Sequence, residues 1–399
     1  MSSTGYFQYL MRATVHCAVG ASIRLPSLFS GMGAKRVLII SDAGLRDVGI
    51  VDAVVEIFNA NGRGSKPAVA GVYTDISADA EVKSINAAVQ FAREVGADSI
   101  LALGGGSVLD AAKGVKYCLQ NKLQDVADAI KSGIKMELWP DVKPSDIPHI
   151  AVPTTAGTGA EVTPAAVIYN ADAGFKGVLM SPYLDADMAV LDAKLTEKLP
   201  AAITIATAMD ALTHSLEAIA SPTANHFTDA HALRAGQLIE ENLPRVIENP
   251  GDLNARSALL QASTMACDAV SNSLNVAYVH NISHALGGKY RIPHGEANGV
   301  LLPFVLEHMA PFYRDKQQRM AQALNIFSAD VGDYLTLTVD RIRLLQQQVG
   351  FAPTFTRHSI PKEEAAQIVV AVQQDPMGGM AMLPEDKILA IVGAAAGWV

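Results

Sequence analysis

The stretch "LALGGGSVLDAAKGV", residues 101–115, joins a short apolar run, three consecutive glycines and a helical pattern that begins at Ser107. Glycines that follow a strand let the backbone approach a pyrophosphate, and the N-terminus of the next helix offers free N–H groups and a positive dipole end to the anion. The GxGxxG fingerprint is absent, so a phosphate-binding loop and an ordinary tight connection both stay open. Either interpretation predicts a strand followed directly by a helix.

The same alternation extends from residue 36 to residue 192. Stretches with helical spacing, such as 79–95, separate short apolar runs at 36–41, 68–74, 99–104 and 147–155. Buried strands that alternate with helices are typical of a mostly parallel, doubly wound sheet. We therefore predict an α/β dinucleotide-binding domain over residues 1–198.

The second half of the chain has a different pattern. Segments rich in Ala, Leu, Gln and Glu, separated by Pro or Gly, predict helices over 201–220, 229–243, 252–275, 301–326, 329–349, 361–374 and 384–397. A chain of 399 residues also exceeds what one compact core usually holds. We therefore predict an all-helical domain over residues 199–399, with the boundary near "KLPAAI" (198–203).

Composition argues against several classes of protein. Half of the residues are hydrophobic and 18% are charged, which indicates large buried cores and argues against disorder. The net charge of −9 is spread without a basic stripe, so we expect no nucleic-acid partner. No apolar run has the length of a membrane span and the N-terminus has no secretory pattern, so we expect a cytoplasmic protein with no membrane partner. The three cysteines, Cys17, Cys118 and Cys267, lack CxxC spacing and are expected to be ordinary reduced thiols.

Two further features of the first half are candidates for cofactor binding. The loop "PTTAGTGAEV" (153–162) follows a strand and supplies the hydroxyl groups of Thr154, Thr155 and Thr158, either to line a cofactor or simply to form a turn. Asp42 follows the apolar run at 36–41. At such a position an acidic side chain can accept hydrogen bonds from ribose hydroxyls and repel a 2′-phosphate, or it can cap the next helix.

The second half contains two segments with the spacing of metal ligands. In "MDALTHSLEA" (209–218), Asp210 and His214 are four residues apart on a predicted helix and therefore share one face. In "YVHNISHALGGKYRIPHGEANG" (278–299), His280 and His284 repeat that spacing, and His294 lies in a predicted turn.

Each pair alone is more typical of a surface hydrogen bond or a core histidine. Five such residues on two segments favour a site for a divalent ion of intermediate softness, Fe(II), Zn, Mn or Co. The remaining histidines show no comparable arrangement and are interpreted as structural: His16, His149, His226, His231, His308 and His358.

These motifs together resemble the iron-containing (group III) alcohol dehydrogenase family, which is related in fold to glycerol dehydrogenase and dehydroquinate synthase. The resemblance covers nearly the whole chain and includes "GGGSVLDAAK", "PTTAGTGAEV", "MDALTHSLEA", "HNISHALGG" and "PHGEANGVLLP", in the family's order and spacing. It implies an α/β dinucleotide domain, a helical domain and an active site in the cleft between them.

The resemblance also implies roles for individual residues. The metal ligands would be Asp210, His214, His280 and His294, because the family's first metal-binding histidine lies fourteen residues before the histidine of its "PHG" motif. His284 matches a histidine near the nicotinamide that helps to pass a proton to solvent. Gly105, Gly106 and Ser107 would meet the pyrophosphate of NAD, Asp110 would face the carboxamide end, and Asp42 would favour NAD over NADP. The rest of the cofactor would be lined by Thr154, Thr155, Thr158 and Lys176.

Three positions depart from the family's pattern. Ser271 stands where well-known members carry a Phe against the substrate and nicotinamide, which makes it a candidate for the substrate pocket. Ala277 replaces the usual Gly before the histidine segment, and "DPMGGMAMLPED" (375–386) lacks the usual Asn-Pro-Arg.

The expected activity is reversible, NAD-dependent oxidation of a primary alcohol to an aldehyde by hydride transfer, with a divalent metal, Fe(II) first and Zn or Mn as alternatives, acting as Lewis acid. The expected partners are a small alcohol or aldehyde and further copies of the chain, in a homodimer or a higher homo-oligomer. Two alternatives stay open: a hydroxyacid or maleylacetate-type reductase on the same fold, and a nucleotide- and metal-binding scaffold without turnover.

Overall fold

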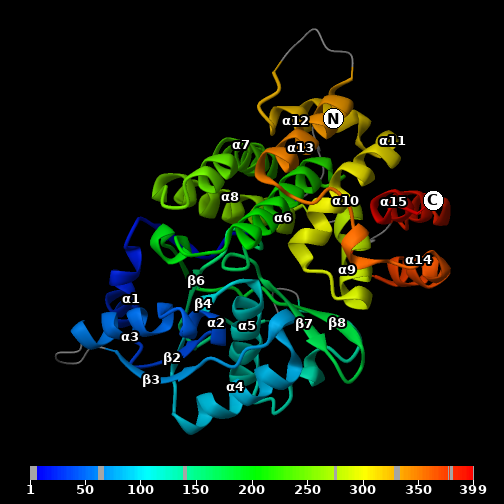
Figure 1. Ribbon diagram of the computed structural model, residues 1–399. Coiled ribbons are helices and arrows are strands. Elements are labelled where there is room, and N and C mark those ends of the chain that lie inside the picture. The colour runs from blue at the N-terminus through cyan, green and yellow to red at the C-terminus, as the bar shows by residue number, and fades with distance from the viewer. Residues whose placement is uncertain are drawn as a thin grey trace. The chain divides into compact units, whose positions relative to one another are not determined.

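A computed structural model describes residues 7–61, 67–137, 142–273, 276–327, 333–375, 377 and 381–398. The chain divides into two compact units (Figure 1). The α/β unit consists of Met11–Thr155 and Gly159–Lys198, and the helical unit consists of Met1–Leu10, Ala156–Thr158 and Leu199–Val399. Each unit is considered by itself below.

The α/β unit is built on a six-stranded parallel sheet in the order β1-β9-β6-β4-β2-β3. Its strands are β1 (Thr14–Cys17), β2 (Arg36–Ile40), β3 (Ala68–Tyr73), β4 (Ser99–Gly104), β6 (His149–Pro153) and β9 (Met188–Leu191). The four strands expected from the apolar runs are confirmed, and β1 and β9 extend the sheet beyond them.

Helices cover both faces of this sheet because its central strands are apolar on both sides. Along β2, Leu38 and Ile40 belong to one buried cluster while Val37 and Ile39 belong to another. The first cluster also contains residues of α4 (Val82–Glu94) and α5 (Gly106–Gln120), and the second contains residues of α1 (Leu25–Gly31) and α3 (Ile50–Asn61). The predicted doubly wound sheet is therefore confirmed.

A second, smaller sheet lies in the same unit and was not expected from the sequence. Its strands are β5 (Ile134–Met136), β7 (Ala165–Asn170) and β8 (Phe175–Met180), in the order β5-β8-β7. The pair β7 and β8 is antiparallel and is joined by a short turn in which Gly174 has a φ of 71°. This positive φ suits glycine, which has no Cβ to clash.

The helical unit contains the helices α6 (Ala201–Ala220), α7 (His226–Glu248), α8 (Leu253–Ser271), α9 (Tyr278–Tyr290), α10 (His294–His308), α11 (Ala310–Tyr313), α12 (Gln317–Gln322), α13 (Tyr334–Val349), α14 (Ala365–Gln374) and α15 (Glu385–Ala396). The helical character predicted for this half is confirmed. Two predicted helix ends, the start at residue 329 and the end at residue 275, lie outside the described residues. Short helices with 3₁₀ geometry complete the two units at Ala21–Arg24, Ala78–Ala80, Val126–Ala129, Ala193–Thr196, Arg314–Lys316, Thr356–His358 and Lys362–Glu364.

The single helix predicted over 301–326 is wrong. The chain forms α10, which begins seven residues earlier at His294, and then α11, a 3₁₀ turn and α12. Pro311 lies in the first turn of α11, where its missing N–H costs no helical hydrogen bond, whereas Pro303 is accommodated inside α10. The predicted turn at His294 is likewise wrong, since Pro293 is the N-cap and His294 is the first helical residue.

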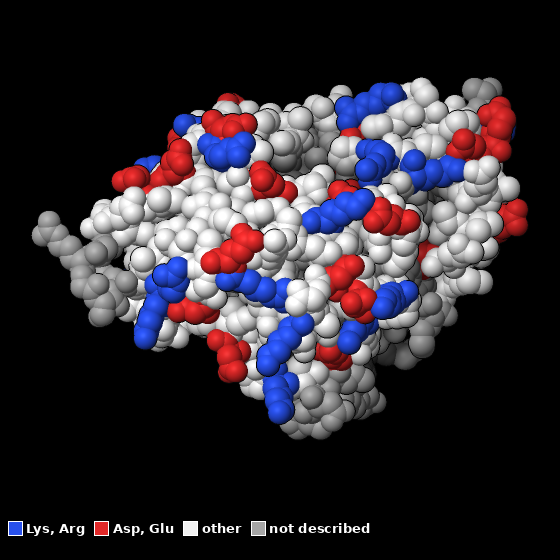
Figure 2. All heavy atoms as spheres, turned by 90° about the horizontal axis from the view of Figure 1, so that it is seen from below, with Lys and Arg blue, Asp and Glu red and all other residues white. Residues whose placement is uncertain are grey.

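Charged side chains of both signs lie on the surface of the protein. On the face shown in Figure 2, basic and acidic side chains are interspersed, with no stripe of one sign. Within the described parts of the chain, none of the helices has the combination of length and apolar character that a membrane crossing requires.

Candidate metal and nucleotide sites

Helix α6 brings two of the predicted ligands to one buried face. Asp210 and His214 lie one turn apart, and both side chains are buried. The helix packs against α7, α8 and α10, so this face looks into the helical unit and not towards solvent. The i, i+4 spacing therefore makes a buried pair here and not a surface hydrogen bond.

Three of the four predicted ligands converge on one point. The ligand atoms of Asp210, His280 and His294 all lie within 4.8 Å of one another. The Nε2 atoms of both histidines are 3.6 Å from Asp210 Oδ1. Ligand atoms that share a tetrahedral ion at about 2.05 Å are about 3.3 Å apart, so small side-chain shifts would let this trio bind one ion.

The fourth predicted ligand, His214, lies beside this trio without joining it. Its ring stacks on that of His280, with the centroids 4.7 Å apart and the planes at 17°. Its Nδ1 is buried without a hydrogen-bond partner among the described residues. Burial lowers the pKa of His214 to about 4, so the ring is neutral at physiological pH and keeps a lone pair.

Asn298 of α10 occupies the centre of the cluster and was not predicted from the sequence. Its Nδ2 lies 2.6 Å from Asp210 Oδ1, 3.0 Å from His280 Nε2 and 3.2 Å from His294 Nε2. An amide nitrogen has only two hydrogens to donate to these three acceptors. The amide N–H groups thus stand where a cation would lie, and they leave the acceptor set incompletely satisfied.

The charges of the cluster also fit a cation. The carboxylates of Asp210 and Glu217 are both buried, and among the described contacts neither meets a lysine or an arginine. Burial alone would raise the pKa of Asp210, but the neighbouring imidazoles of His214, His294 and His280 hold it well below its usual range. Among the described residues, imidazoles are thus the groups that balance these buried carboxylates, and a divalent cation would balance them further. One carboxylate with several imidazoles is a donor set that suits Fe(II), Zn or Mn.

His284, the predicted proton relay, lies at the edge of the cluster. Its ring centroid is 5.3 Å from that of His294 and 6.0 Å from that of His280. Its Nδ1 faces Asp375 Oδ2 at 3.4 Å. Asp375 opens the segment 375–386 that departs from the family's pattern, of which residues 376 and 378–380 lie outside the described residues.

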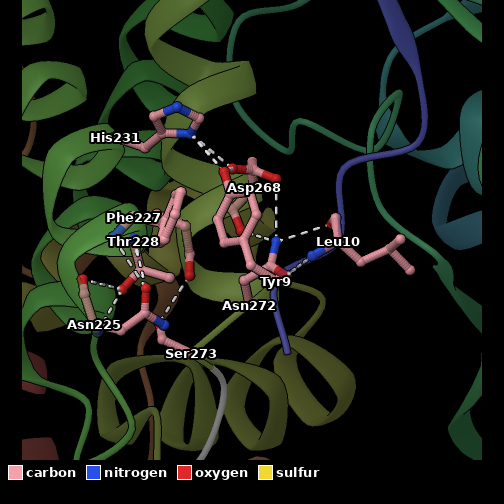
Figure 3. A network of polar contacts seen from close by, with 10 residues as sticks. Tyr9, Leu10, Asn225, Phe227, Thr228, His231, Asp268, Asn272 and Ser273 are labelled. Atoms are coloured by element: carbon pink, nitrogen blue, oxygen red, sulfur yellow. Dashed lines mark hydrogen bonds and ion pairs between the residues drawn. The ribbon is translucent and has the colours of Figure 1, made fainter. Parts of the chain in front are cut away.

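A different histidine, His231, belongs to a second polar network in the helical unit (Figure 3). Its Nδ1 lies 2.7 Å from Asp268 Oδ2, and the hydroxyl of Tyr9 donates to the same oxygen. Asn272 donates to Asp268 Oδ1 at 3.1 Å. This network is distinct from the metal-ligand candidates and agrees with the structural role expected for His231.

The glycine stretch forms the predicted strand-to-helix connection in the α/β unit. Gly105 is the N-cap of α5, so the N–H groups of Gly106 and Ser107 in its first turn have no intrahelical acceptor. A Cβ on Gly104 would lie 2.6 Å from Val108 Cβ, and one on Gly105 would lie 3.3 Å from Thr155 Oγ1. Glycine thus permits close packing here and leaves the helix N-terminus uncovered.

The predicted side chains around this loop are partly engaged with one another. Thr154 N–H donates to the carbonyl oxygen of Gly104 at 3.0 Å, which holds the second loop against the first. The Asp110 carboxylate accepts from Lys113 Nζ at 3.1 Å and from the N–H of Val167 at 3.0 Å. Asp110 is therefore tied to β7 in this structure.

Lys176 and Ser107 meet through a third residue, Asp79. Lys176 Nζ pairs with Asp79 Oδ1 at 2.7 Å, and Ser107 Oγ accepts from the Asp79 N–H at 3.0 Å.

Asp42 caps α2 (Ala43–Asp47) by accepting from the N–H of Leu45 at 2.9 Å. Asp42 is thus a helix cap in this structure, and a contact between Asp42 and the ribose of NAD stays a prediction.

Two predicted residues belong to the helical unit. Thr158 belongs to the helical unit and not to the unit that carries the glycine loop. Ser271 is the last residue of α8 and its side chain is exposed. Within the described residues none of the three cysteines forms a disulfide, and Cys118 and Cys267 are buried while Cys17 is exposed.

Comparison with known proteins shows which family the sequence of this chain matches. The profile described as iron-containing alcohol dehydrogenase matches residues 13–193, and the profile of the C-terminal part of the Fe-containing alcohol dehydrogenase family matches residues 204–396. Long-chain-alcohol dehydrogenase 1 of Geobacillus thermodenitrificans is 33% identical over 392 residues, which cover 95% of this chain and 94% of that protein. The probable alcohol dehydrogenase EutG of Escherichia coli is 39% identical over 261 residues, which cover 65% of this chain and 64% of that protein.

The fold agrees with these relatives. The crystal structure of a 1,3-propanediol oxidoreductase superposes with a TM-score of 0.88 at 27% identity, covering 98% of this chain and 100% of that chain. The two family profiles match both halves of the sequence, in the order of the α/β and helical units. The chain belongs to the iron-containing alcohol dehydrogenase family.

Proposed function

We propose that this protein is a NAD-linked, metal-dependent alcohol dehydrogenase that interconverts a primary alcohol and an aldehyde. The observation that carries the proposal is the convergence of Asp210, His280 and His294 on one buried point, in a chain that belongs to this family. The excess of hydrogen-bond acceptors around Asn298 Nδ2 and the two buried carboxylates give that point the charge and lone pairs of a cation site.

The metal would be held by Asp210, His280 and His294, with His214 as the fourth ligand after a rotation of its ring. The family name and the mixed oxygen and nitrogen donors favour Fe(II), with Zn or Mn as alternatives. When bound, such an ion supplies Lewis-acid chemistry that lowers the pKa of an alcohol hydroxyl. Asp210 would supply the negative charge, and the neutral imidazoles would supply the other lone pairs.

NAD would be held by the first turn of α5. The free N–H groups of Gly106 and Ser107 suit a pyrophosphate, and Thr154 and Thr155 lie against the same loop. NAD accepts the hydride in this chemistry. Asp110, Thr158 and Lys176 would contact the rest of the cofactor, and Lys176 would have to share or give up its pairing with Asp79.

The preference for NAD over NADP rests on Asp42. A carboxylate at this position would repel a 2′-phosphate, and removing it is worth about 1–3 kcal/mol in a partly buried site. Replacing Asp42 with Gly should therefore raise the relative use of NADP. The ratio of kcat/KM values for the two cofactors measures this, and an unchanged ratio would leave Asp42 as a helix cap alone.

His284 would carry the released proton away from the alcohol. An imidazole can accept a proton on one nitrogen and release one from the other. The Asp375 carboxylate, whose Oδ2 lies 3.4 Å from His284 Nδ1, is in a position to accept that proton.

The alcohol would be larger or more polar than ethanol, because Ser271 leaves room and offers a hydroxyl where well-known relatives carry a Phe. The name of the Geobacillus relative, which refers to long-chain alcohols, agrees with this. One methylene of pocket contact is worth about 1–3 kcal/mol. Ser271→Phe should thus shift relative kcat/KM towards ethanol and propanol by about ten-fold, and an unchanged ranking would remove Ser271 from the pocket.

One experiment tests the activity directly. Protein purified without oxygen is assayed for bound metal and then for NADH formation with a graded series of alcohols, with NAD and with NADP. We expect about one divalent ion per chain, turnover of primary alcohols and loss of turnover on chelation. Bound metal with turnover of hydroxyacids or maleylacetate alone would indicate the reductase alternative, and bound metal with no turnover would indicate a scaffold.

Location in the cytoplasm and assembly as a homodimer are the remaining expectations. Light scattering of the purified protein measures the assembly, and a mass of two chains is expected.

A further inference from the structure

Glu217 lies on the same face of α6 as the two predicted ligands of that helix. Asp210, His214 and Glu217 follow one another at i, i+4 and i+7, and all three are buried. Helix α6 thus carries a buried carboxylate one turn beyond its last predicted ligand. No predicted role of the metal or nucleotide site uses it.

Both oxygens of Glu217 accept hydrogen bonds from α9. Oε1 accepts from the N–H of Val279 at 2.7 Å, and Oε2 accepts from Nδ1 of His280. Val279 is the second residue of α9, whose N-cap Ala277 makes no side-chain cap hydrogen bond. Glu217 therefore satisfies one free N–H of the helix start and places a negative charge at its positive end.

The contact with Nδ1 favours a proton on that nitrogen of His280, because the Glu217 carboxylate only accepts hydrogen bonds. When Nδ1–H donates to Glu217, Nε2 is left with its lone pair, and Nε2 is the atom that lies 3.6 Å from Asp210 Oδ1 and 3.0 Å from Asn298 Nδ2. A metal-binding histidine commonly donates its other N–H to a carboxylate, which sets the ring orientation and raises the basicity of the ligand atom.

We propose that Glu217 is the positioning residue of the metal centre, which holds His280 in the tautomer and orientation that present Nε2 to the ion. The proposal rests on the metal site of the proposed function and adds to it a residue outside the ligand set. A single carboxylate thereby couples the start of α9 to the ligand geometry on α6.

The variant Glu217→Gln separates this role from simple helix capping. A glutamine has one acceptor oxygen, so it can bond the Val279 N–H or the His280 Nδ1–H but not both. If its oxygen stays on Val279, its NH₂ group faces Nδ1 and favours the tautomer with the proton on Nε2, which removes the ligand lone pair. Capping is then preserved while the metal ligand is lost.

The test is titration of metal-free protein with Co(II), followed by its visible absorption. Loss of a carboxylate behind a metal-binding histidine typically weakens binding by about 10–100-fold. We expect Glu217→Gln to show a weakening of this size. The matched control is Asp268→Asn, since Asp268 is a buried carboxylate that accepts from Nδ1 of a histidine outside the cluster, His231. That control should bind Co(II) like the parent protein.

A double variant shows whether Glu217 acts through His280. The His280→Ala background is expected to retain no metal through purification, so its weakened site is titrated at high Co(II) concentration. In that background Glu217→Gln should cause no further loss of Co(II) affinity, because the ring that it orients is gone. A further loss by the same factor would overturn the proposal. Parent-like Co(II) affinity of Glu217→Gln would also overturn it and leave Glu217 as a cap. Folded parent protein that binds no Co(II) would instead refute the metal site of the proposed function.

A measurement on the parent protein covers the case in which the variants do not fold. Histidine-selective ¹⁵N labelling of the Zn-loaded protein reports which ring nitrogen carries the proton. For His280 we expect a protonated Nδ1 and a metal-bound Nε2. A metal-bound Nδ1 would overturn the proposal.

Discussion

The helical unit contains two carboxylate–histidine pairs that differ in their surroundings. Glu217 pairs with Nδ1 of His280, and Asp268 pairs with Nδ1 of His231 at 2.7 Å. Around His280 the acceptor atoms outnumber the available N–H donors. Around His231, Tyr9 and Asn272 supply further donors to the carboxylate, and the histidine side chain is one-third exposed.

This difference separates a binding site from a structural network. Buried polar groups are normally satisfied by hydrogen bonds, so a buried cluster that is short of donors is a candidate cation site. The network around Asp268 has its donors in place and needs no ligand (Figure 3). The same pair of residue types therefore has different roles, which the neighbouring atoms decide.

The largest expected contrast is between two histidine-to-alanine variants. His280→Ala should abolish metal retention and turnover, because one of the few ligands is lost and the others hold the ion less tightly. His231→Ala should keep both. Metal content and kcat, measured side by side, test the contrast. Full metal occupancy in His280→Ala, or metal loss in His231→Ala, would break it.

A smaller effect is expected for His284, which lies at the edge of the cluster. His284→Ala should retain the metal but lower kcat by about 100-fold, the low end for a proton-transferring group. Added imidazole should restore part of the rate, because it can carry the proton in place of the missing ring. Loss of metal equal to that of His280→Ala would make His284 a ligand.

The variant Asp268→Asn should reduce stability without touching the metal site. An asparagine keeps one acceptor oxygen for donors that now bond two, so we expect a loss of about 1–3 kcal/mol in the free energy of unfolding of the helical unit. Chemical denaturation monitored by circular dichroism measures this loss, and metal content is the control. Reduced metal content in the folded variant would show that the Asp268 network and the metal site are not independent.

The smallest effect is expected at the N-terminal segment. Tyr9→Phe removes one donor to Asp268 and should cost about 1 kcal/mol. The N–H of Leu10, which donates to Asn272 Oδ1 at 2.6 Å, should then exchange faster with solvent. Hydrogen exchange at Leu10 is the measurement, and protection equal to that of the parent protein would show that Tyr9 does not hold the segment in place.

Predictions from local pattern succeeded where one element decides the outcome. The helix 201–220 is observed as predicted, and with it the shared face of Asp210 and His214, because helical spacing alone places them. The strands of the main sheet followed from apolar runs that need burial on both faces. The single helix expected over 301–326 was wrong, because Pro311 begins a new helix while Pro303 stays inside α10, and composition alone does not distinguish these two prolines.

Residues that act across elements were missed. Asn298 lies four residues after His294, a spacing that becomes visible only once His294 is placed on a helix and not in a turn. Glu217 lies three residues after His214 in the quoted motif, yet its partners are 62 and 63 residues away. The network of Tyr9 and Asp268 spans 259 residues and has no local signal.

The sequence by itself determined the periodicities, the glycine connection at 104–106 and the residue types able to bind a metal, because these depend on neighbours within a few positions. Only the tertiary structure decided which histidines share a point in space. His280 and His294 meet Asp210 because α9 and α10 pack beside α6, whereas His231 on α7 meets Asp268 on α8. The balance of hydrogen-bond donors and acceptors at each site depends on residues from helices far apart in the chain. Packing of those helices brings these residues together.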